Sequence, residues 1–151
     1  MNPAKIAIAQ SCLDGAETGH MTFPQIVGTL MHEGFESYAI DFRRGTAVYY
    51  TADGDSVELA TRPVGAPVAA AFQSAPVQAA IREAQQLVPG YTYKGFCRKV
   101  AEAGCAGYFV SFSGRRAVYM GRTGETHVER FPDKGPQSGG AIRSPLLHPP
   151  P

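Results

Sequence analysis

Two stretches of the chain alternate apolar and polar side chains with the two-residue period that is typical of half-buried β-strands. They span residues 37–55 and 107–125. Each predicts a strand, a tight turn and a second strand, because Arg44-Gly45 and Gly114-Arg115 interrupt the alternation near its middle. A further turn and a short third strand follow in both cases, with the sequences SVELA and THVERF.

A helix is predicted directly before each of these stretches. Residues 22–34 carry an apolar stripe at helical spacing, and Thr22 with Gln25 forms the pattern of a capping box at its start. Gly34 follows where a helix usually ends. Residues 92–104 repeat the pattern. The stripes consist of Ile26, Val27, Leu30 and Met31 in the first helix and of Phe96, Cys97 and Val100 in the second.

One more helix precedes each unit. Asn2 is the expected N-cap of a helix over residues 2–13, and Ser74 is that of a helix over residues 74–88. The predicted order is therefore α-α-β-β-β, twice, with a linker rich in Pro and Ala at 60–72.

The two units resemble one another in sequence. When the chain is shifted by 70 residues, eight of the 33 pairs between 22–54 and 92–124 are identical without a gap, whereas unrelated segments would share about two. We therefore expect one α+β domain built by internal duplication, with about six mainly antiparallel strands and four helices. Its repeats cover about 2–60 and 74–131, and the Pro- and Gly-rich residues 132–151 are expected to form a flexible tail.

The units resemble the bacterial family DUF1398, also known as the YbcV-like proteins. The resemblance lies in TFPQIVGTLMHEGFESYAIDFRRGTAVYYTADGD and in GFCRKVAEAGCAGYFVSFSGRRAVYMGRTGETHVERFP. It covers about residues 22–132, and GRTGETHVERFP is its most distinctive part. Some members carry the label phage envelope protein, so the resemblance implies a bacterial or phage-related protein. The family has no established activity, substrate or cofactor, so the resemblance implies a fold and no chemistry.

Composition narrows the classes of function. Fourteen basic and thirteen acidic side chains leave a formal charge of +1, which argues against nucleic acid or an acidic membrane surface as a partner. The three cysteines form no Cys-x-x-Cys pair and no His lies at ligand spacing, so neither a metal nor a cofactor is expected. No apolar run is long enough for a signal peptide or a membrane span, and we expect a cytoplasmic protein.

Strand alternation assigns side chains to two faces of the predicted sheet. One face carries the strand residues that the units share, such as Tyr38 and Tyr108, which is typical of a core. On the other face the units differ, and this face is more apolar than a solvated sheet face. Helices, a protein partner or a second copy of the chain could cover it, or it could line a pocket for a small ligand. Its members are Ala39, Asp41, Arg43, Val48 and Tyr50 in the first unit and Phe109, Ser111, Arg116, Val118 and Met120 in the second.

Turn length decides how these strands pair. If two-residue turns join them, Phe42 lies opposite Ala47, and His127 lies beside Met120 on the divergent face. Glu129 shares the face of His127, as general acid-base chemistry would require. An adjacent His and Glu without a nucleophile is nevertheless more often a simple hydrogen-bonded pair.

The candidate binding residues combine this pair with members of the divergent face. Asp is disfavoured within strands, so Asp41 needs a partner, and Arg43 is the simplest one. Arg43 and Arg116 are expected either to hold an anion or to face solvent. No catalytic residue is assigned. The candidate set is His127, Glu129, Asp41, Tyr50, Met120, Arg43 and Arg116.

Two functions are consistent with these patterns. The first is a non-catalytic binding or interaction module that acts through the divergent face. The second is a small enzyme, or a sensor of a small anionic ligand, that uses His127, Glu129 and Asp41. A flat exposed face favours the first, and a closed pocket around these polar groups favours the second.

Overall fold

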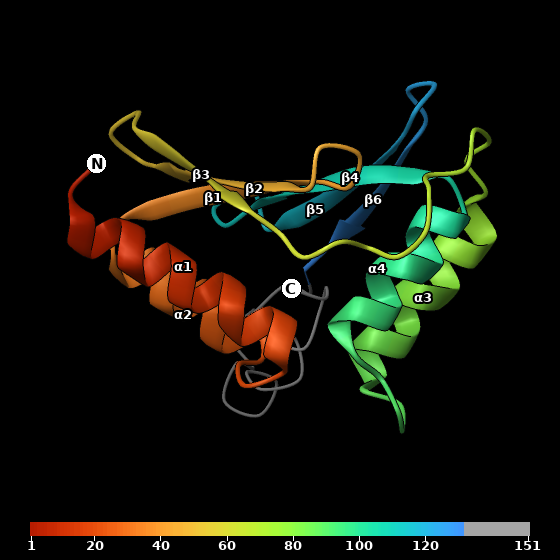
Figure 1. Cartoon of the computed structure of the whole chain (residues 1–151), viewed down its shortest axis with the longest axis horizontal. Coiled ribbons are helices and arrows are strands. Elements are labelled where there is room, and N and C mark those ends of the chain that lie inside the picture. The colour runs from red at the N-terminus through yellow and green to blue at the C-terminus, as the bar shows by residue number, and fades with distance from the viewer. Residues whose placement is uncertain (132–151) are drawn as a thin grey trace, which may run out of the picture.

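The computed structural model describes residues 1–131, and the predicted tail at 132–151 lies outside the described residues. Two helices are followed by three strands, and the same order then occurs a second time (Figure 1). The elements are α1 (Pro3–Thr18), α2 (Phe23–His32), β1 (Phe35–Asp41), β2 (Thr46–Thr51), β3 (Ser56–Ala60), α3 (Ser74–Gln86), α4 (Tyr93–Glu102), β4 (Cys105–Ser111), β5 (Arg116–Gly121) and β6 (Thr126–Arg130).

All these strands join in one antiparallel sheet with the order β3-β2-β1-β4-β5-β6. The first strands of the two halves, β1 and β4, pair at its centre, so each half of the chain forms one half of the sheet. The predicted α+β fold with four helices and six antiparallel strands is therefore confirmed. We call residues 1–60 the first half and residues 74–131 the second half.

The helices all lie on one face of the sheet, with α1 and α2 beneath the first half and α3 and α4 beneath the second (Figure 1). That face carries the core, where Tyr38, Tyr49, Tyr108 and Tyr119 are at most 3% exposed. Within residues 1–131 no helix covers the other face, which we call the open face. No helix in this part of the chain is long and apolar enough to cross a membrane.

The helix before each hairpin begins at a threonine, as predicted. The Thr22 hydroxyl accepts the Gln25 N–H at 3.3 Å, and the Gln25 side chain accepts the Thr22 N–H at 2.8 Å, which completes the capping box. Thr92 accepts the N–H of Gly95 at 3.0 Å, but Gly95 has no side chain to return the bond. The second half therefore keeps one of the two capping bonds.

The other two helices begin in different ways. Asn2 caps α1 as predicted, because its side-chain oxygen accepts the Lys5 N–H at 2.9 Å. The prediction that Ser74 caps α3 is wrong, because the helix begins at Ser74 and Gln73 precedes it without a side-chain bond. The N–H of Gln73 instead donates to the carbonyl of Ala103 at 2.8 Å, which ties the linker to the end of α4.

The first turn of each hairpin is longer than predicted. Ile40 pairs with Ala47, whereas a two-residue turn would have paired Phe42 with Ala47. The Asp41 carboxylate explains the difference, because it accepts two backbone N–H groups of a four-residue turn at 2.9 and 3.0 Å. The second half has the same two-residue shift. An even shift leaves every side chain on its predicted face.

The turn between β5 and β6 is closed by a hydrogen bond from the Gly121 N–H to the Glu125 carbonyl at 2.8 Å. It therefore has three residues, 122–124, where two were predicted, and the last of them, Gly124, has a φ of +92°. His127 therefore pairs with Tyr119 and does not lie beside Met120. A shift of one residue moves every side chain of a strand to the other face. The predicted position of His127 and Glu129 on the divergent face is consequently wrong, and both lie on the helix-covered face.

Candidate functional site

The open face presents three rows of side chains that run across the whole sheet. The register aligns one residue from each strand in every row. From β3 to β6, the middle row consists of Glu58, Val48, Ala39, Phe109, Val118 and Val128. Apart from the carboxylate at one end, this row is apolar over its whole length, which at about 4.8 Å per strand spans about 24 Å.

The rows on either side of the middle row are mixed in character. One consists of Ser56, Tyr50, Ser37, Ser111, Arg116 and Arg130, and the other of Ala60, Thr46, Asp41, Gly107, Met120 and Thr126. Tyr50 and Met120 are each 38% exposed and Val128 is 42% exposed. Contiguous exposed apolar side chains with a polar border are typical of a protein-binding surface.

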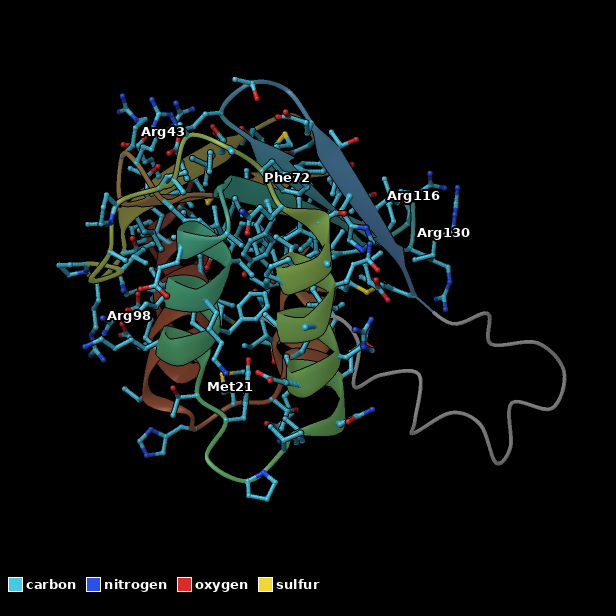
Figure 2. All side chains as sticks on the ribbon, turned by 90° about the vertical axis from the view of Figure 1, so that its right-hand side faces the viewer. Met21, Arg43, Phe72, Arg98, Arg116 and Arg130 are labelled. Atoms are coloured by element: carbon cyan, nitrogen blue, oxygen red, sulfur yellow. The ribbon has the colours of Figure 1, made fainter. Side chains whose placement is uncertain are left out.

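Charge is distributed unevenly over the open face. Arg116 and Arg130 are direct cross-strand neighbours at one corner, where both side chains point away from the helices (Figure 2). Glu58 lies on the opposite edge strand, where a nitrogen of Arg44 lies 3.8 Å from its carboxylate. Arg43 belongs to the turn after β1, far from the arginine corner in Figure 2. The second half of the face is thus basic, and the first half carries the acidic groups.

Asp41 has a local structural role that accounts for an acidic residue at the end of a strand. The two N–H groups that it accepts belong to Arg43 and Arg44, so its expected pairing with Arg43 is made with the backbone. At the equivalent position in the second half, the Ser111 hydroxyl accepts the N–H of Gly114 at 2.9 Å. The two residues perform the same function with different side chains.

His127 and Glu129 form a compact polar group with helix α3. His127 Nε2 lies 3.2 Å from one carboxylate oxygen of Glu129, and Gln85 donates to the other oxygen at 2.9 Å. The imidazole lies beside the Tyr119 ring, with 6.4 Å between ring centroids. Because both carboxylate oxygens are already engaged, the arrangement is that of a hydrogen-bonded pair.

The structure does not assemble the predicted acid-base group. Asp41 lies on the open face of β1, whereas His127 and Glu129 lie on the opposite face of β6. The two strands are three positions apart in the sheet, which corresponds to about 14 Å. Of the other candidates, Tyr50, Met120 and Arg116 share the open face, and Arg43 belongs to the adjoining turn.

The cysteines offer no reactive thiolate at neutral pH. Burial raises the pKa of the Cys97 thiol to about 12 and those of Cys12 and Cys105 to about 11. The thiols therefore keep their protons, whereas nucleophilic chemistry requires the thiolate. Among residues 1–131, no three His, Cys, Asp or Glu side chains gather in a way that could hold a metal ion.

Comparison with known families gives one match, which covers most of the described residues. Residues 10–129 match the family model described as Protein of unknown function (DUF1398). The chain belongs to the DUF1398 family. The match covers both halves of the sheet and reaches further towards the N-terminus than the sequence resemblance at 22–132. A comparison with curated proteins finds no match.

Three residues of this DUF1398 chain that shape the site were absent from the predicted set. Val128 and Arg130 belong to the open face because the three-residue turn moves each side chain of β6 to the face opposite the predicted one. Gln85 completes the polar group of His127. A turn that ends in Gly fits a two-residue or a three-residue loop, so the sequence offers only an ambiguous signal for the first two.

Proposed function

We propose that this protein is a non-catalytic binding module that associates through its open face, with a second copy of the chain as the partner. The observation that carries the proposal is the apolar middle row, which crosses the sheet where no helix of residues 1–131 covers it. A sheet face with this composition normally packs against another layer.

The differences between the halves make the open face complementary to a copy of itself. A twofold axis parallel to the strands, between β1 and β4, sets the first half of one copy against the second half of the other. Phe109 then faces Ala39, so that a large side chain meets a small one. By the same rotation Arg116 faces the ring of Tyr50, a favourable cation–π arrangement.

The same arrangement accommodates the charged groups. Asp41 faces Gly107, which has no side chain and leaves room for the carboxylate. Arg130 comes within one row of Glu58, so the basic corner of one copy approaches the acidic edge of the other. Aligned sheets pack about 10 Å apart, which lets such side chains interdigitate.

An enzyme that uses His127, Glu129 and Asp41 is less well supported, because these groups lie on opposite faces of the sheet and both oxygens of Glu129 have partners. From the family resemblance, we further infer a bacterial or phage-related protein that acts in the cytoplasm.

Sedimentation velocity over a range of protein concentrations tests the proposal with a matched pair of variants. Met120→Glu places a carboxylate on the open face, and Met31→Glu makes the same change on α2, where Met31 is also exposed. We expect a concentration-dependent dimer for the parent chain and for Met31→Glu, and a weakening of about tenfold or more for Met120→Glu.

Three results would overturn the proposal as stated. A chain that stays monomeric at all concentrations has no self-association. A dimer that Met120→Glu leaves unchanged uses another surface. A different protein that binds the monomer and is lost in Met120→Glu would keep the open face as the interface but replace the second copy as its occupant.

A further inference from the structure

A cavity of about 390 Å³ lies beneath the sheet, between the end of α1, the start of α4 and the linker that follows β3. Its inner wall is apolar and consists of Ile40 and Phe42 from the sheet side, Val64 from the linker, and Tyr93 and Cys97 from α4. At about 30 Å³ for each water-sized group, it has room for about 13 such groups. None of the candidate residues predicted from the sequence lines it.

The second half fills the corresponding space with an aromatic ring. Thr61 lines the cavity, and the residue 70 positions later is Phe131. The backbone makes equivalent hydrogen bonds at both positions. The Thr61 N–H donates to the carbonyl of Gly45 at 2.9 Å, and the Phe131 N–H donates to the carbonyl of Arg115 at 2.8 Å. The Phe131 ring packs edge-on against Phe23, with 5.6 Å between centroids. The first half therefore lacks a side chain that the fold can accommodate there.

Tyrosine hydroxyls provide polar groups behind the apolar wall. The hydroxyls of Tyr93 and Tyr108 are hydrogen-bonded at 2.7 Å. The Tyr38 hydroxyl has no hydrogen-bond partner among residues 1–131, although Tyr38 is only 2% exposed. Tyr38 borders a small void of about 10 Å³ that shares two walls, Ile40 and Tyr93, with the cavity. An unsatisfied buried hydroxyl is uncommon and costly, and it offers a hydrogen bond to a guest or a water molecule.

Of the charged residues that line the cavity, Lys94 is the one without a partner among residues 1–131. Glu17, whose side chain is only 10% exposed, accepts the backbone N–H of Arg62 at 2.9 Å and lies 3.6 Å from its guanidinium. These two residues neutralise one another and hold the linker in place. Lys94, an exposed residue, also lines the cavity, and its side chain makes no hydrogen bond or ion pair with residues 1–131.

We propose that the cavity binds a small amphipathic monoanion, with its apolar body against Ile40, Phe42 and Val64 and its anionic group at the ammonium of Lys94. Pockets of this size with apolar walls and a few polar groups are typical small-molecule sites. The Tyr93 hydroxyl offers a hydrogen bond to a polar group at the inner end of the ligand. The site is separate from the open face and does not depend on the proposed association.

The first experiment compares two probes of the same shape, 3-phenylpropionate and 3-phenylpropanol, by calorimetric titration and by nitrogen-15 NMR of the full chain. The carboxylate probe is expected to bind more tightly than the alcohol, by about threefold, which corresponds to a solvent-exposed ion pair. Its shift changes are expected at residues 61–65 and 93–97, away from the middle row of the open face.

Variants then test the two parts of the site. Thr61→Phe adds the ring that the second half has and should reduce binding of 3-phenylpropionate at least tenfold, whereas Thr123→Phe, in an exposed turn, should have no effect. Lys94→Gln should abolish the preference for the acid over the alcohol. Lys99→Gln is its control on the same helix, because Lys99 lies 2.6 Å from Glu83, outside the cavity.

The proposal has clear points of failure. It is overturned if 3-phenylpropionate does not bind the parent chain, or if its shift changes fall on the open face. It is also overturned if the alcohol binds as tightly as the acid, or if folded Thr61→Phe binds as the parent does. If Thr61→Phe does not fold, the shift map of the parent chain and the Lys94→Gln titration still decide the outcome.

Discussion

The two halves of the sheet place different side chains at equivalent positions of their edge strands. On the helix-covered face, β3 carries Val57 and Leu59, and 70 residues later β6 carries His127 and Glu129. The first pair packs against the core, whereas the second pair forms hydrogen bonds and reaches Gln85. The same backbone thus tolerates either an apolar or a polar edge, because edge positions are only half-buried.

A second difference arises from the linker, which joins the halves but packs mainly on one of them. Gly104 approaches the linker so closely that a Cβ there would overlap the carbonyl of Ala71, and a Cβ on Gly121 would lie 2.8 Å from Phe72. The equivalent of Gly104 in the first half is Gly34, where a Cβ would lie 3.2 Å from the flexible end of Lys5 and would meet no backbone atom. The repeated positions are therefore equivalent in conformation but not in environment.

The largest expected effect concerns a core position that the halves share. Tyr49→Ala and Tyr119→Ala each remove a ring that is at most 3% exposed, and each should lower the free energy of unfolding by about 3 kcal/mol or more. Urea titration followed by circular dichroism measures this directly. A loss below about 1 kcal/mol for either variant would contradict the view that both halves contribute equally to one core.

The Tyr119 hydroxyl sharpens this prediction. It has no hydrogen-bond partner among residues 1–131, whereas the Tyr108 hydroxyl is bonded to that of Tyr93. Tyr119→Phe should therefore be neutral or slightly stabilising, and Tyr108→Phe should cost about 1 kcal/mol. Equal losses in the two variants would show that the Tyr119 hydroxyl has a partner in solution.

The glycine pair separates conformation from environment. Gly34 and Gly104 have φ values of +92° and +94°, so alanine at either position costs about 1–2 kcal/mol in left-handed strain. Gly104→Ala must also displace the linker backbone and should cost at least about 1 kcal/mol more. Urea denaturation of the two variants measures the difference. Equal stability of Gly34→Ala and Gly104→Ala would contradict this packing of the linker against Gly104.

Alkaline pH should weaken the fold through its buried thiols. Burial raises the pKa of Cys97 from 9.0 to about 12, so the folded state retains a proton that the unfolded chain releases. Stability must therefore fall as the pH rises above about 9, by up to about 1.4 kcal/mol per pH unit for each such thiol. Cys97→Val, which copies Val27 of the first half, should make the decline between pH 9 and 11 shallower. An unchanged slope would mean that Cys97 is not buried in solution.

The smallest effect is expected at the polar edge. His127→Val with Glu129→Leu gives β6 the side chains of β3. The free energy of unfolding should change by less than about 1 kcal/mol, because the pair lies on an edge strand, 19% and 27% exposed, where solvent reaches it and an ion pair contributes little. His127→Ala alone should behave in the same way. If His127→Ala melts like Tyr119→Ala, His127 is an essential core residue and the two edges are not interchangeable.

Most of the fold could be predicted because its determinants are local. Strand alternation assigned Tyr38, Ile40 and Phe42 to the buried face, and the Thr22 capping box located a helix start. Turn length could not be predicted, because it depends on contacts that a pattern does not contain, such as the Asp41 carboxylate that organises a longer turn. At β6 the three-residue turn moved His127 to the other face and removed it from the predicted site.

The cavity has a sequence signal that is weaker but visible. At the offset of 70 residues Thr61 aligns with Phe131, which marks a space that one half fills and the other leaves open. The identical positions of the repeat end earlier in the chain, so this pair carries no identity that would draw attention to it. The position of the linker could not be predicted, because Pro- and Ala-rich segments have no periodicity that specifies their contacts.

Site-directed cross-linking tests most directly whether the divergence between the halves makes the open face complementary to itself. The three native cysteines are buried, so Tyr50→Cys and Arg116→Cys each introduce one accessible thiol. A mixture of the two proteins treated with a short bismaleimide should yield a cross-linked dimer between positions 50 and 116, and each protein alone should yield little. Efficient cross-linking of Tyr50→Cys with itself, or none in the mixture, would contradict the proposed packing of unlike halves.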